Sequence, residues 1–335
     1  MEVSEDCRTA FWSGKSVFVT GGTGLVGSWL VKKLLAARAH VALLVKDTNP
    51  LSELSRSGDI ARVAITYGSL EDFSTLEHAI NLHDVDTVFH LGAQTQVIAA
   101  YRYPLQTFEA NVRGTYNLLE ACRLHPDLVK RVVIASTDKA YGTQKVLPYT
   151  ETTPLEARNS YDVSKSCADL ISQSYFHTYG LPLSITRFGN VYGGGDWNQN
   201  RIVPGTIRCL AEGRRPVIRS DGTPLRDYIY VEDVAEAYLR LAERIDDPAV
   251  VGQAFNFSHG KPVSVLQIVG ALRKLMGRED IEPLIQNAAK GEIQEQYLDS
   301  TKALKLLDWT PRFGLEYGLT NTIAWYLDYL GERTE

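Results

Sequence analysis

Short apolar runs alternate with longer amphipathic segments along the first 190 residues. The runs at residues 16–20, 41–45, 62–67, 87–91, 131–135 and 183–187 have the length of buried strands. Between them, apolar side chains recur at helical spacing in residues 28–37, 70–82, 105–124 and 161–179. Strands and helices that alternate across short connections predict an α/β fold with a doubly wound parallel sheet of the Rossmann type.

The pattern changes after residue 190, where turns are denser and elements shorter. We expect a main domain of residues 15–190, to which residues 231–257 return, and a smaller C-terminal lobe of residues 191–230 and 258–330. Further helices are predicted at residues 264–277, 301–308 and 314–330, packed by Trp309, Trp325 and Tyr326. Residues 1–14 read as a leader with little structure of their own.

Composition narrows the class of protein. The 335 residues are 44% apolar and 22% charged, as in ordinary soluble enzymes. The net charge of −5 and the dispersed basic residues argue against nucleic-acid binding. With neither an export signal nor an apolar run long enough to span a bilayer, a cytoplasmic protein is expected. The four cysteines lie singly in different segments, so neither disulfides nor a zinc site is indicated.

A glycine-rich turn follows the first predicted strand and precedes the first long helix. It comprises Gly21, Gly22, Thr23, Gly24, Leu25, Val26 and Gly27. Glycine lets the backbone bend sharply and approach a pyrophosphate, and a helix N-terminus favours negative charge. In this context the turn predicts a dinucleotide site. The second strand ends at Lys46 and Asp47, a basic residue that suits NADP beside an acidic one that suits NAD, so NAD is expected and NADP stays open.

Polar residues with catalytic potential follow the strand at 131–135. Thr137, Asp138 and Lys139 leave its carboxyl end, where open α/β sheets bind ligands. Tyr161 and Lys165 are four residues apart and therefore share a helix face. An ammonium group beside a phenol stabilises the phenolate, which makes Tyr161 a candidate base for an alcohol proton.

Two other side chains were weighed on the same grounds. His90 ends the fourth strand and is expected to be a packed, hydrogen-bonded core residue. Arg226 lies among aromatic residues at the start of a strand-like run and is the best candidate for gripping a diphosphate with two hydrogen bonds.

In these motifs the sequence resembles the extended short-chain dehydrogenase/reductase family, and within it the nucleotide-sugar 4,6-dehydratases. The resemblance covers nearly the whole chain after about residue 15. It is greatest to the dehydratases that act on CDP-glucose, in the segments Ser-Thr-Asp-Lys-Ala-Tyr-Gly at 136, Tyr-Asp-Val-Ser-Lys at 161 and Gly-Gly-Gly-Asp-Trp at 193.

The resemblance implies further site residues and an assembly. NAD would also contact Ser69, Leu70, Leu91 and Ala93, and a nucleotide-diphosphate hexose would contact Gln94, Asn190, Arg201, Val203, Arg219 and Arg226. A homodimer is expected through helices 105–124 and 161–179 of each subunit, with higher order undetermined. The sequence departs from the relatives at Ser69 and Ser160, where they often have Asp and Pro. It also has Lys139 where dTDP-glucose dehydratases have Glu, which leaves the identity of the C5 base open.

The reaction implied is oxidation of the hexose at C4, loss of water across C5 and C6, and hydride return to C6. Tyr161, its pKa lowered by Lys165 and by the charge of the nicotinamide, would take the C4 hydroxyl proton while Thr137 holds the oxygen. Asp138 would be the acid and Lys139 the base or its electrostatic partner. A 4-epimerase of the same family, a decarboxylase of a uronic acid sugar and a non-catalytic nucleotide-sugar binding protein remain alternatives.

Overall fold

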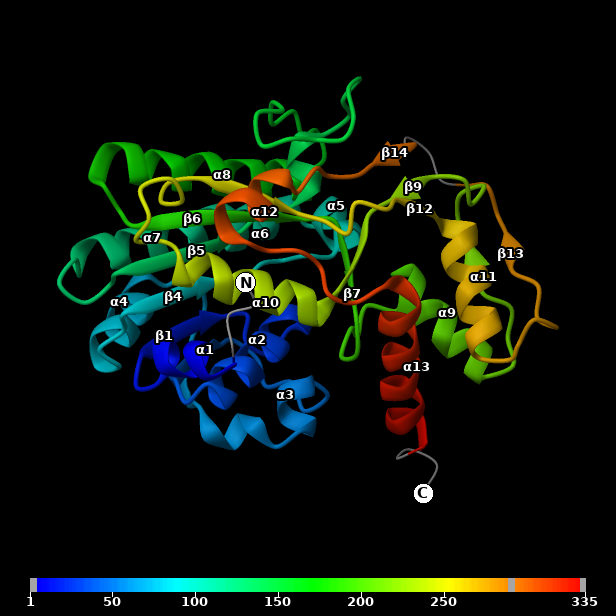
Figure 1. Cartoon of the computed structure of the whole chain (residues 1–335), viewed down its shortest axis with the longest axis horizontal. Coiled ribbons are helices and arrows are strands. Elements are labelled where there is room, and N and C mark those ends of the chain that lie inside the picture. The colour runs from blue at the N-terminus through cyan, green and yellow to red at the C-terminus, as the bar shows by residue number, and fades with distance from the viewer. Residues whose placement is uncertain (1–4, 289–292, 332–335) are drawn as a thin grey trace.

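The computed structural model describes residues 5–288 and 293–331, and it is built around one seven-stranded parallel sheet (Figure 1). The strand order is β3-β2-β1-β4-β5-β6-β11. The bounds are β1 Ser16–Thr20, β2 His40–Val45, β3 Ala64–Tyr67, β4 Thr87–His90, β5 Arg131–Ala135, β6 Leu183–Phe188 and β11 Ala254–Phe257. The predicted doubly wound fold is confirmed. Its order reverses between β1 and β4, the position at which such sheets bind ligands.

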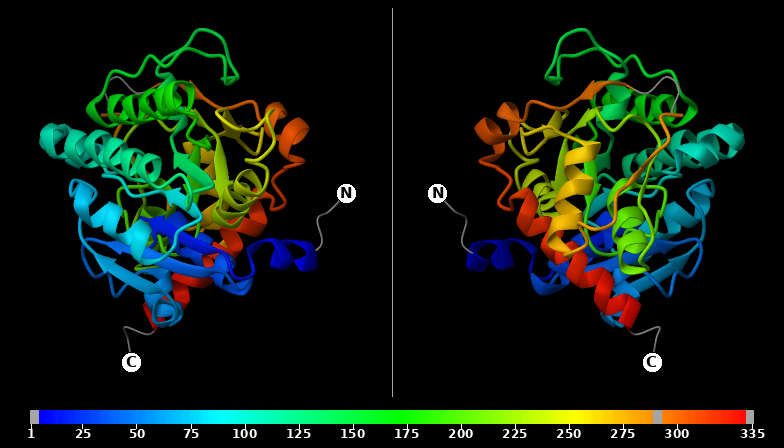
Figure 2. Two further views of the ribbon diagram at one scale, coloured as in Figure 1. Left: turned by 90° about the vertical axis from the view of Figure 1, so that its left-hand side faces the viewer. Right: turned by 90° about the vertical axis from the view of Figure 1, so that its right-hand side faces the viewer.

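Helices cover both faces of this sheet. Helices α2 (Leu25–Ala36) and α10 (Val231–Glu243) pack on one face, and α10 contacts β5 and β6 as well as α2. Helices α4 (Phe73–Leu82), α7 (Gly114–Leu124) and α8 (Ser160–Tyr179) cover the other face, as the side views in Figure 2 show. Residues 231–257 thus contribute helix α10 and the edge strand β11 to this layered sheet.

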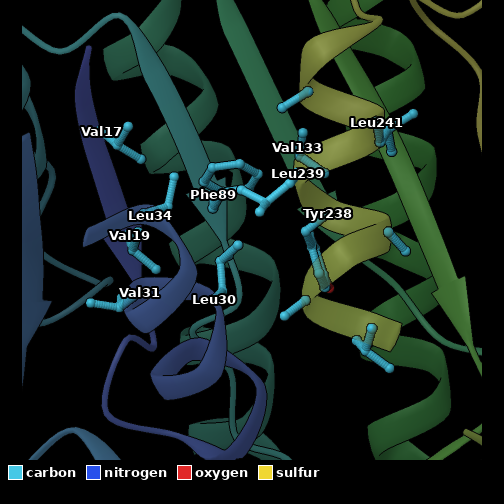
Figure 3. Close-up of a cluster of buried hydrophobic side chains, with 14 of the residues drawn as sticks. Val17, Val19, Leu30, Val31, Leu34, Phe89, Val133, Tyr238, Leu239 and Leu241 are labelled. Atoms are coloured by element: carbon cyan, nitrogen blue, oxygen red, sulfur yellow. The ribbon is translucent and has the colours of Figure 1, made fainter. Parts of the chain in front are cut away.

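Strand β1 shows how the sequence specifies the two layers. Val17 and Val19 point into the cluster formed with α2 and α10, whereas Phe18 points into the cluster formed with α4 and α7. Successive side chains of a strand face opposite sides, so a strand buried on both faces is apolar throughout. In Figure 3, Phe89 of β4 lies between α2 and α10, and its ring meets that of Tyr238 edge-on at 6.2 Å.

A third cluster lies beside the sheet, to the right in Figure 1. Helices α9 (Ile202–Ala211), α11 (Val265–Leu275) and α13 (Leu315–Gly331) build it together with Tyr192, Tyr228 and Tyr230. Short strands accompany them: β7 Asn190–Tyr192, β8 Val217–Ile218, β9 Leu225–Arg226, β10 Tyr228–Tyr230, β12 Val263–Ser264, β13 Leu284–Ile285 and β14 Glu295–Gln296. Of the predicted lobe, residues 289–292 lie outside the described residues, and the domain limits stay a prediction.

The expectation of an unstructured leader is wrong for residues 5–14, and residues 1–4 lie outside the described residues. Helix α1 (Glu5–Trp12) packs against the sheet domain. The Trp12 side chain is fully buried, and its Nε1 donates to Glu243 Oε1 at 2.8 Å. Glu243 is 231 residues away in sequence, so no local pattern could predict that this helix would be stabilised.

Two predicted elements differ from the structure: one helix is interrupted and one strand begins later. Residues 105–124 comprise α6 (Pro104–Phe108), one π-helical turn η2 (Glu109–Arg113) and α7, and α5 (Val97–Arg102) precedes them. Arg62 belongs to the 3₁₀ turn η1 (Asp59–Arg62) rather than to β3. The remaining elements are α3 (Glu53–Arg56), the 3₁₀ turn η3 (Asp138–Tyr141) and α12 (Thr301–Leu307), which packs with Trp309 beneath β11.

Among the described residues, no helix combines the length and apolarity that crossing a bilayer requires. No cluster of three or more His, Cys, Asp and Glu side chains in residues 5–288 and 293–331 is arranged to hold a metal. Cys122, Cys167 and Cys209 are free thiols.

Candidate active site

The glycine turn between β1 and α2 is a close-fitting backbone cradle. Gly21 has φ +75°, and a Cβ there would lie 2.7 Å from the backbone nitrogen of Gly92, beyond the end of β4. A Cβ on Gly27 would lie 2.1 Å from the carbonyl oxygen of Gly21. Helix α2 begins after Gly24 with no side-chain cap, which leaves its first amide groups free to bind phosphate. The turn, together with Thr23, Leu25 and Val26, therefore offers the close backbone approach and the free amide groups that a pyrophosphate needs.

The ends of β2 and β3 present both charges that could select a cofactor. Lys46 Nζ lies 3.4 Å from Glu71 Oε1, and Asp47 is exposed next to it. Ser69 hydrogen-bonds Glu71 and contributes to lowering the pKa of its carboxyl, as does Lys46, against the opposing effect of burial. Because a carboxylate already accompanies Lys46, this lysine is not an unopposed cation for a 2′-phosphate, which favours NAD.

His90 belongs to a chain of hydrogen bonds whose directions are determined. Gly92 N donates to Thr20 Oγ1 at 3.0 Å, and in a neutral ring with its proton on Nε2 the Thr20 hydroxyl donates to His90 Nδ1 at 2.8 Å. Thr115 Oγ1 donates to the carbonyl of Asn111 at 2.6 Å and therefore accepts from His90 Nε2 at 3.0 Å. Burial, reinforced by the charge of Lys165, lowers the pKa of His90 to about 3. His90 is the packed core residue that the sequence predicted.

Asn111 continues this chain to the helix that carries Tyr161. It lies in the π-helical turn η2 and is 1% exposed. Its Oδ1 accepts from Gln94 N at 2.7 Å, and its Nδ2 donates to Gln94 O at 3.0 Å and Ser164 Oγ at 2.9 Å. Ser164 in turn donates to the carbonyl of Tyr161 at 2.6 Å. The loop after β4, with Leu91, Ala93 and Gln94, is thus tied to the first turn of α8.

Asp138 opens the 3₁₀ turn η3 at the carboxyl end of β5. It is 3% exposed, and Thr137 Oγ1 donates to its Oδ1 at 3.1 Å. Burial raises the pKa of Asp138 to about 6, although Lys139 and the Thr137 hydrogen bond oppose the shift. A carboxyl with a pKa in this range can donate a proton near neutral pH. Asp138 is therefore suited to general acid catalysis.

Tyr161 and Lys165 occupy the same face of α8, but their electrostatics differ from the sequence expectation. Burial raises the pKa of Tyr161 to about 12, and the charge that opposes it is that of Arg201. Lys165 Nζ donates to the carbonyl of Ala135, and burial lowers the pKa of Lys165 to about 8. Lys165 does not act on the Tyr161 pKa here, because the lysine is turned to the end of β5, and the lowering expected from Lys165 together with a nicotinamide charge stays a prediction.

The arginines expected to bind substrate lie in different environments. Arg201 is exposed, pairs with Asp196 Oδ2 at 3.1 Å and acts on Tyr161. Arg226 is buried, donates to Leu225 O at 2.8 Å and acts on Asp138. Arg219 is exposed and donates to Asn200 Oδ1 at 2.7 Å. Arg201 and Arg226 thus lie near enough to Tyr161 and Asp138 for their charges to act on these residues. Arg219 contacts the neighbourhood of Arg201 through Asn200.

Two further predicted substrate residues lie next to these arginines. Asn190 begins β7, and its backbone N donates to the carbonyl of Asp227 at 2.8 Å. Val203 is buried in the first turn of α9, two residues after Arg201.

Comparison with known proteins agrees with this geometry. The sequence profile of the family described as GDP-mannose 4,6 dehydratase matches residues 18–322. The chain belongs to this family of extended short-chain dehydrogenases/reductases. The CDP-glucose 4,6-dehydratase of Salmonella typhimurium is 32% identical over 332 residues, which cover 94% of this chain and 91% of that protein.

Solved structures of the extended short-chain dehydrogenase/reductase family share the fold. The dTDP-glucose 4,6-dehydratase of Streptomyces venezuelae, solved with NAD bound, has a TM-score of 0.85 and 27% identity, covering 95% of this chain and 98% of its own. The UDP-glucose 4-epimerase of Thermotoga maritima, solved with UDP-glucose, has a TM-score of 0.86 and 30% identity, covering 94% and 99%. Dehydratases and epimerases both match, so the family alone does not distinguish the two reactions.

Asp227 lies near the candidate site, but nothing in the sequence singles it out. It is 1% exposed, its Oδ2 accepts from Ser258 Oγ and from Leu298 N at 3.3 Å, and its charge raises the pKa of Asp138. The neighbouring Arg226 drew attention to this segment, but no spacing rule pairs residue 227 with residue 138. Asn111 was placed on a helix without a role, and its position three residues before Gly114 was the signal of an interrupted helix.

The neutral state of His90 predicts a pH dependence of stability. Its folded pKa of about 3 lies below the ordinary value of 6.5, so its contribution is present above pH 6.5 and is lost as pH falls toward 3. Wild type should therefore lose about 2 kcal/mol more unfolding free energy than His90→Gln between pH 7.5 and 5, measured with urea. His40→Gln, at an exposed histidine, should retain the wild-type dependence. Equal pH dependence of His90→Gln and wild type would contradict a buried neutral His90.

Proposed function

We propose that the protein is an NAD-dependent nucleotide-sugar 4,6-dehydratase that converts an NDP-hexose, CDP-glucose above others, to the NDP-4-keto-6-deoxyhexose. The observation that carries this proposal is the buried Asp138 carboxyl, with its pKa raised to about 6 beside Lys139. Removing water across C5 and C6 needs an acid for the C6 hydroxyl and a base for the C5 proton. A turn that places a protonatable carboxyl next to an amine supplies both.

The residues present fit a dinucleotide. The pyrophosphate would fit the close-packed backbone at Gly21 and Gly27 and the uncapped start of α2. Leu70 packs against Gly92 and Gly114, on the side where the adenosine would lie. Bound NAD would supply the hydride acceptor for C4 and the donor for C6. The structures of related dehydratases solved with NAD support this choice.

The residues that would carry out the oxidation step lie on α8 and at the start of η3. The Tyr161 hydroxyl would take the C4 hydroxyl proton, which requires its raised pKa to fall when ligands bind. Positive charge brought near the phenol acts in that direction, as Arg201 already does. The Thr137 hydroxyl, buried at the N-cap of η3, would hold the C4 oxygen.

The elimination step falls to residues 138 and 139. Asp138 donates its proton to the C6 hydroxyl, which leaves as water when the C6–O bond breaks. Lys139 in its neutral form takes the C5 proton, and the electron pair forms the C5–C6 double bond. The charge of Lys139 acts on Asp138 and on Asp162, and transfer of one proton from Lys139 to Asp138 when substrate binds would provide both required forms.

The comparisons support CDP-glucose through the Salmonella typhimurium relative, which is named for that substrate. A 4-epimerase is the second candidate because the Thermotoga maritima epimerase shares the fold. Such an enzyme would use Thr137, Tyr161 and Lys165 but would gain nothing from a protonatable carboxyl at residue 138. We therefore favour dehydration.

Asp138→Asn separates the two reactions. In wild type, CDP-glucose should yield the 4-keto-6-deoxy product, with NADH appearing only transiently. Asp138→Asn should retain the NADH absorbance transient but lose product formation by about 100-fold or more, because the amide cannot donate the proton. Asp127→Asn, at an exposed aspartate outside the site, should behave as wild type. A C4 epimer as the wild-type product, or equal loss of both steps in Asp138→Asn, would contradict the proposal.

Ligand stabilisation tests the substrate class without turnover. At a concentration 100 times its Kd, a nucleotide sugar that binds only the folded state adds about 2.7 kcal/mol of stability. Among CDP-, UDP-, GDP- and dTDP-glucose, CDP-glucose should raise the thermal midpoint most. Arg201→Gln should reduce this shift, and Arg208→Gln should preserve it, since Arg208 is an exposed arginine that pairs with Glu212 on the outer side of α9. A larger shift with another nucleotide would replace CDP-glucose as the favoured substrate.

We further propose a homodimer through residues 105–124, which comprise α6, η2 and α7, and through α8. Apolar side chains are exposed along this surface, including Leu105 at 72%, Leu170 at 55% and Tyr116 at 40%, and Tyr101 of the neighbouring α5 is 86% exposed. Burying such side chains between two copies would remove them from water. Light scattering should give about twice the chain mass of 37.3 kDa. A monomeric mass at micromolar concentration would contradict the assembly.

A further inference from the structure

Arg187 of β6 and Asp169 of α8 form a buried ion pair behind the candidate active site. Arg187 Nε donates to Asp169 Oδ2 at 2.8 Å and Nη2 donates to Oδ1 at 2.9 Å, with the side chains 3% and 0% exposed. Gln173 Nε2 adds a hydrogen bond to Oδ1 at 2.7 Å. The two parallel bonds fix the direction of the guanidinium plane. The pair therefore fixes the position of α8 relative to strand β6.

The remaining nitrogen of this guanidinium extends the pair to Tyr141. Arg187 Nη1 donates to the Tyr141 hydroxyl at 2.8 Å. Since arginine only donates, the phenol oxygen accepts, and its own proton goes to Asn256 Oδ1 at 2.7 Å. Burial raises the pKa of Tyr141 to about 12, so the phenol stays neutral and can act in both directions. Tyr141 is fully buried, and the guanidinium carbon lies 4.9 Å from the centre of its ring.

Tyr141 is the last residue of the turn η3, which begins with Asp138. A second hydrogen bond ties the turn to α8, from Ser166 Oγ to the carbonyl of Ala140 at 3.2 Å. Asp169 lies one helical turn after Lys165 on α8. The hydroxyl of Tyr141 therefore joins the turn that carries Asp138 and Lys139 to the helix that carries Tyr161 and Lys165.

We propose that Tyr141 is a positioning residue for water elimination, through which the Asp169–Arg187 pair sets the place of the Asp138–Lys139 turn relative to α8. This inference rests on the proposed dehydratase function. One hexose must meet Tyr161 at C4 and Asp138 at C6, so the distance between the turn and the helix decides whether both steps can use the same bound sugar. Small misplacements of a reacting group lower its rate strongly.

The position of Tyr141 makes the effect selective. Oxidation at C4 uses Tyr161 and Lys165, which α8 carries without Tyr141, and Thr137, which precedes the turn as its N-cap and lies two residues after the end of β5. Elimination uses Asp138 and Lys139, and only these lie on the turn that Tyr141 ends. Loss of the hydroxyl should leave the first step and impair the second.

Tyr141→Phe tests this with the ring retained and one oxygen removed. In rapid-mixing experiments on the holoenzyme, the rate of NADH appearance should change less than about threefold, and conversion to the 4-keto-6-deoxy product should fall about tenfold. Hydrogen exchange of the backbone amides at residues 138–142 should quicken, and exchange in residues 161–169 should not. This exchange measurement requires no turnover.

Tyr192→Phe is the matched control, because Tyr192 is a buried tyrosine whose hydroxyl donates to Leu315 O at 3.4 Å in the third cluster. It should leave both rates and the exchange at residues 138–142 at wild-type values. Equal slowing of both steps in Tyr141→Phe, or unchanged exchange at residues 138–142, would overturn the inference. Failure of the wild type to form the 4-keto-6-deoxy product would overturn the proposed function, and the exchange result would still decide whether Tyr141 fixes the turn.

Discussion

The register of the parallel strands β1, β4 and β5 is the constraint on which the site depends. Thr20 pairs with His90, and His90 pairs with Ile134, so these three strands end at the same edge. Their continuations are the glycine turn, the Leu91–Gln94 loop and the Thr137–Asp138 turn. A shift of one residue in any pairing would turn each side chain of that strand to the other face. Apolar residues on both faces of β1 prevent such a shift, because each face packs against its own helices.

Polar side chains then tie these ends together where the sheet alone cannot. Thr20, His90 and Thr115 link β1, β4 and α7, and Asn111 carries the link to Ser164 on α8. The hydrogen bonds of this chain are buried, and an unmade one would cost the desolvation of its donor or acceptor. The π-helical turn at Glu109–Arg113 is where Asn111 leaves the regular helix to make these bonds. Interrupted helices of this kind occur at functional sites.

The sequence predicted those parts of the molecule that depend on local periodicity. Residues 161–179 have helical spacing, and α8 spans Ser160–Tyr179. The glycine turn was predicted because strand, turn and helix are adjacent in the chain. Helix α1 escaped prediction because it has eight residues and Trp12 is stabilised by Glu243. The sequence did not indicate a role for three further residues, because each interacts with a residue distant in the chain: Asp227 with Asp138, Tyr141 with Asn256 and Arg187 with Asp169.

The electrostatics of Tyr161 show why charge could not be inferred from spacing. Tyr161 and Lys165 share a face of α8, yet Lys165 donates to the Ala135 carbonyl, and burial leaves the phenol with a pKa of about 12. The same burial raises the pKa of Asp138 to about 6 and lowers that of Lys165 to about 8. Each shift moves its group toward the neutral form, which is what desolvation does to acids and bases alike. The burial that raises the pKa of Asp138 therefore also raises that of Tyr161, and the charge of Arg201 opposes only the second of these shifts.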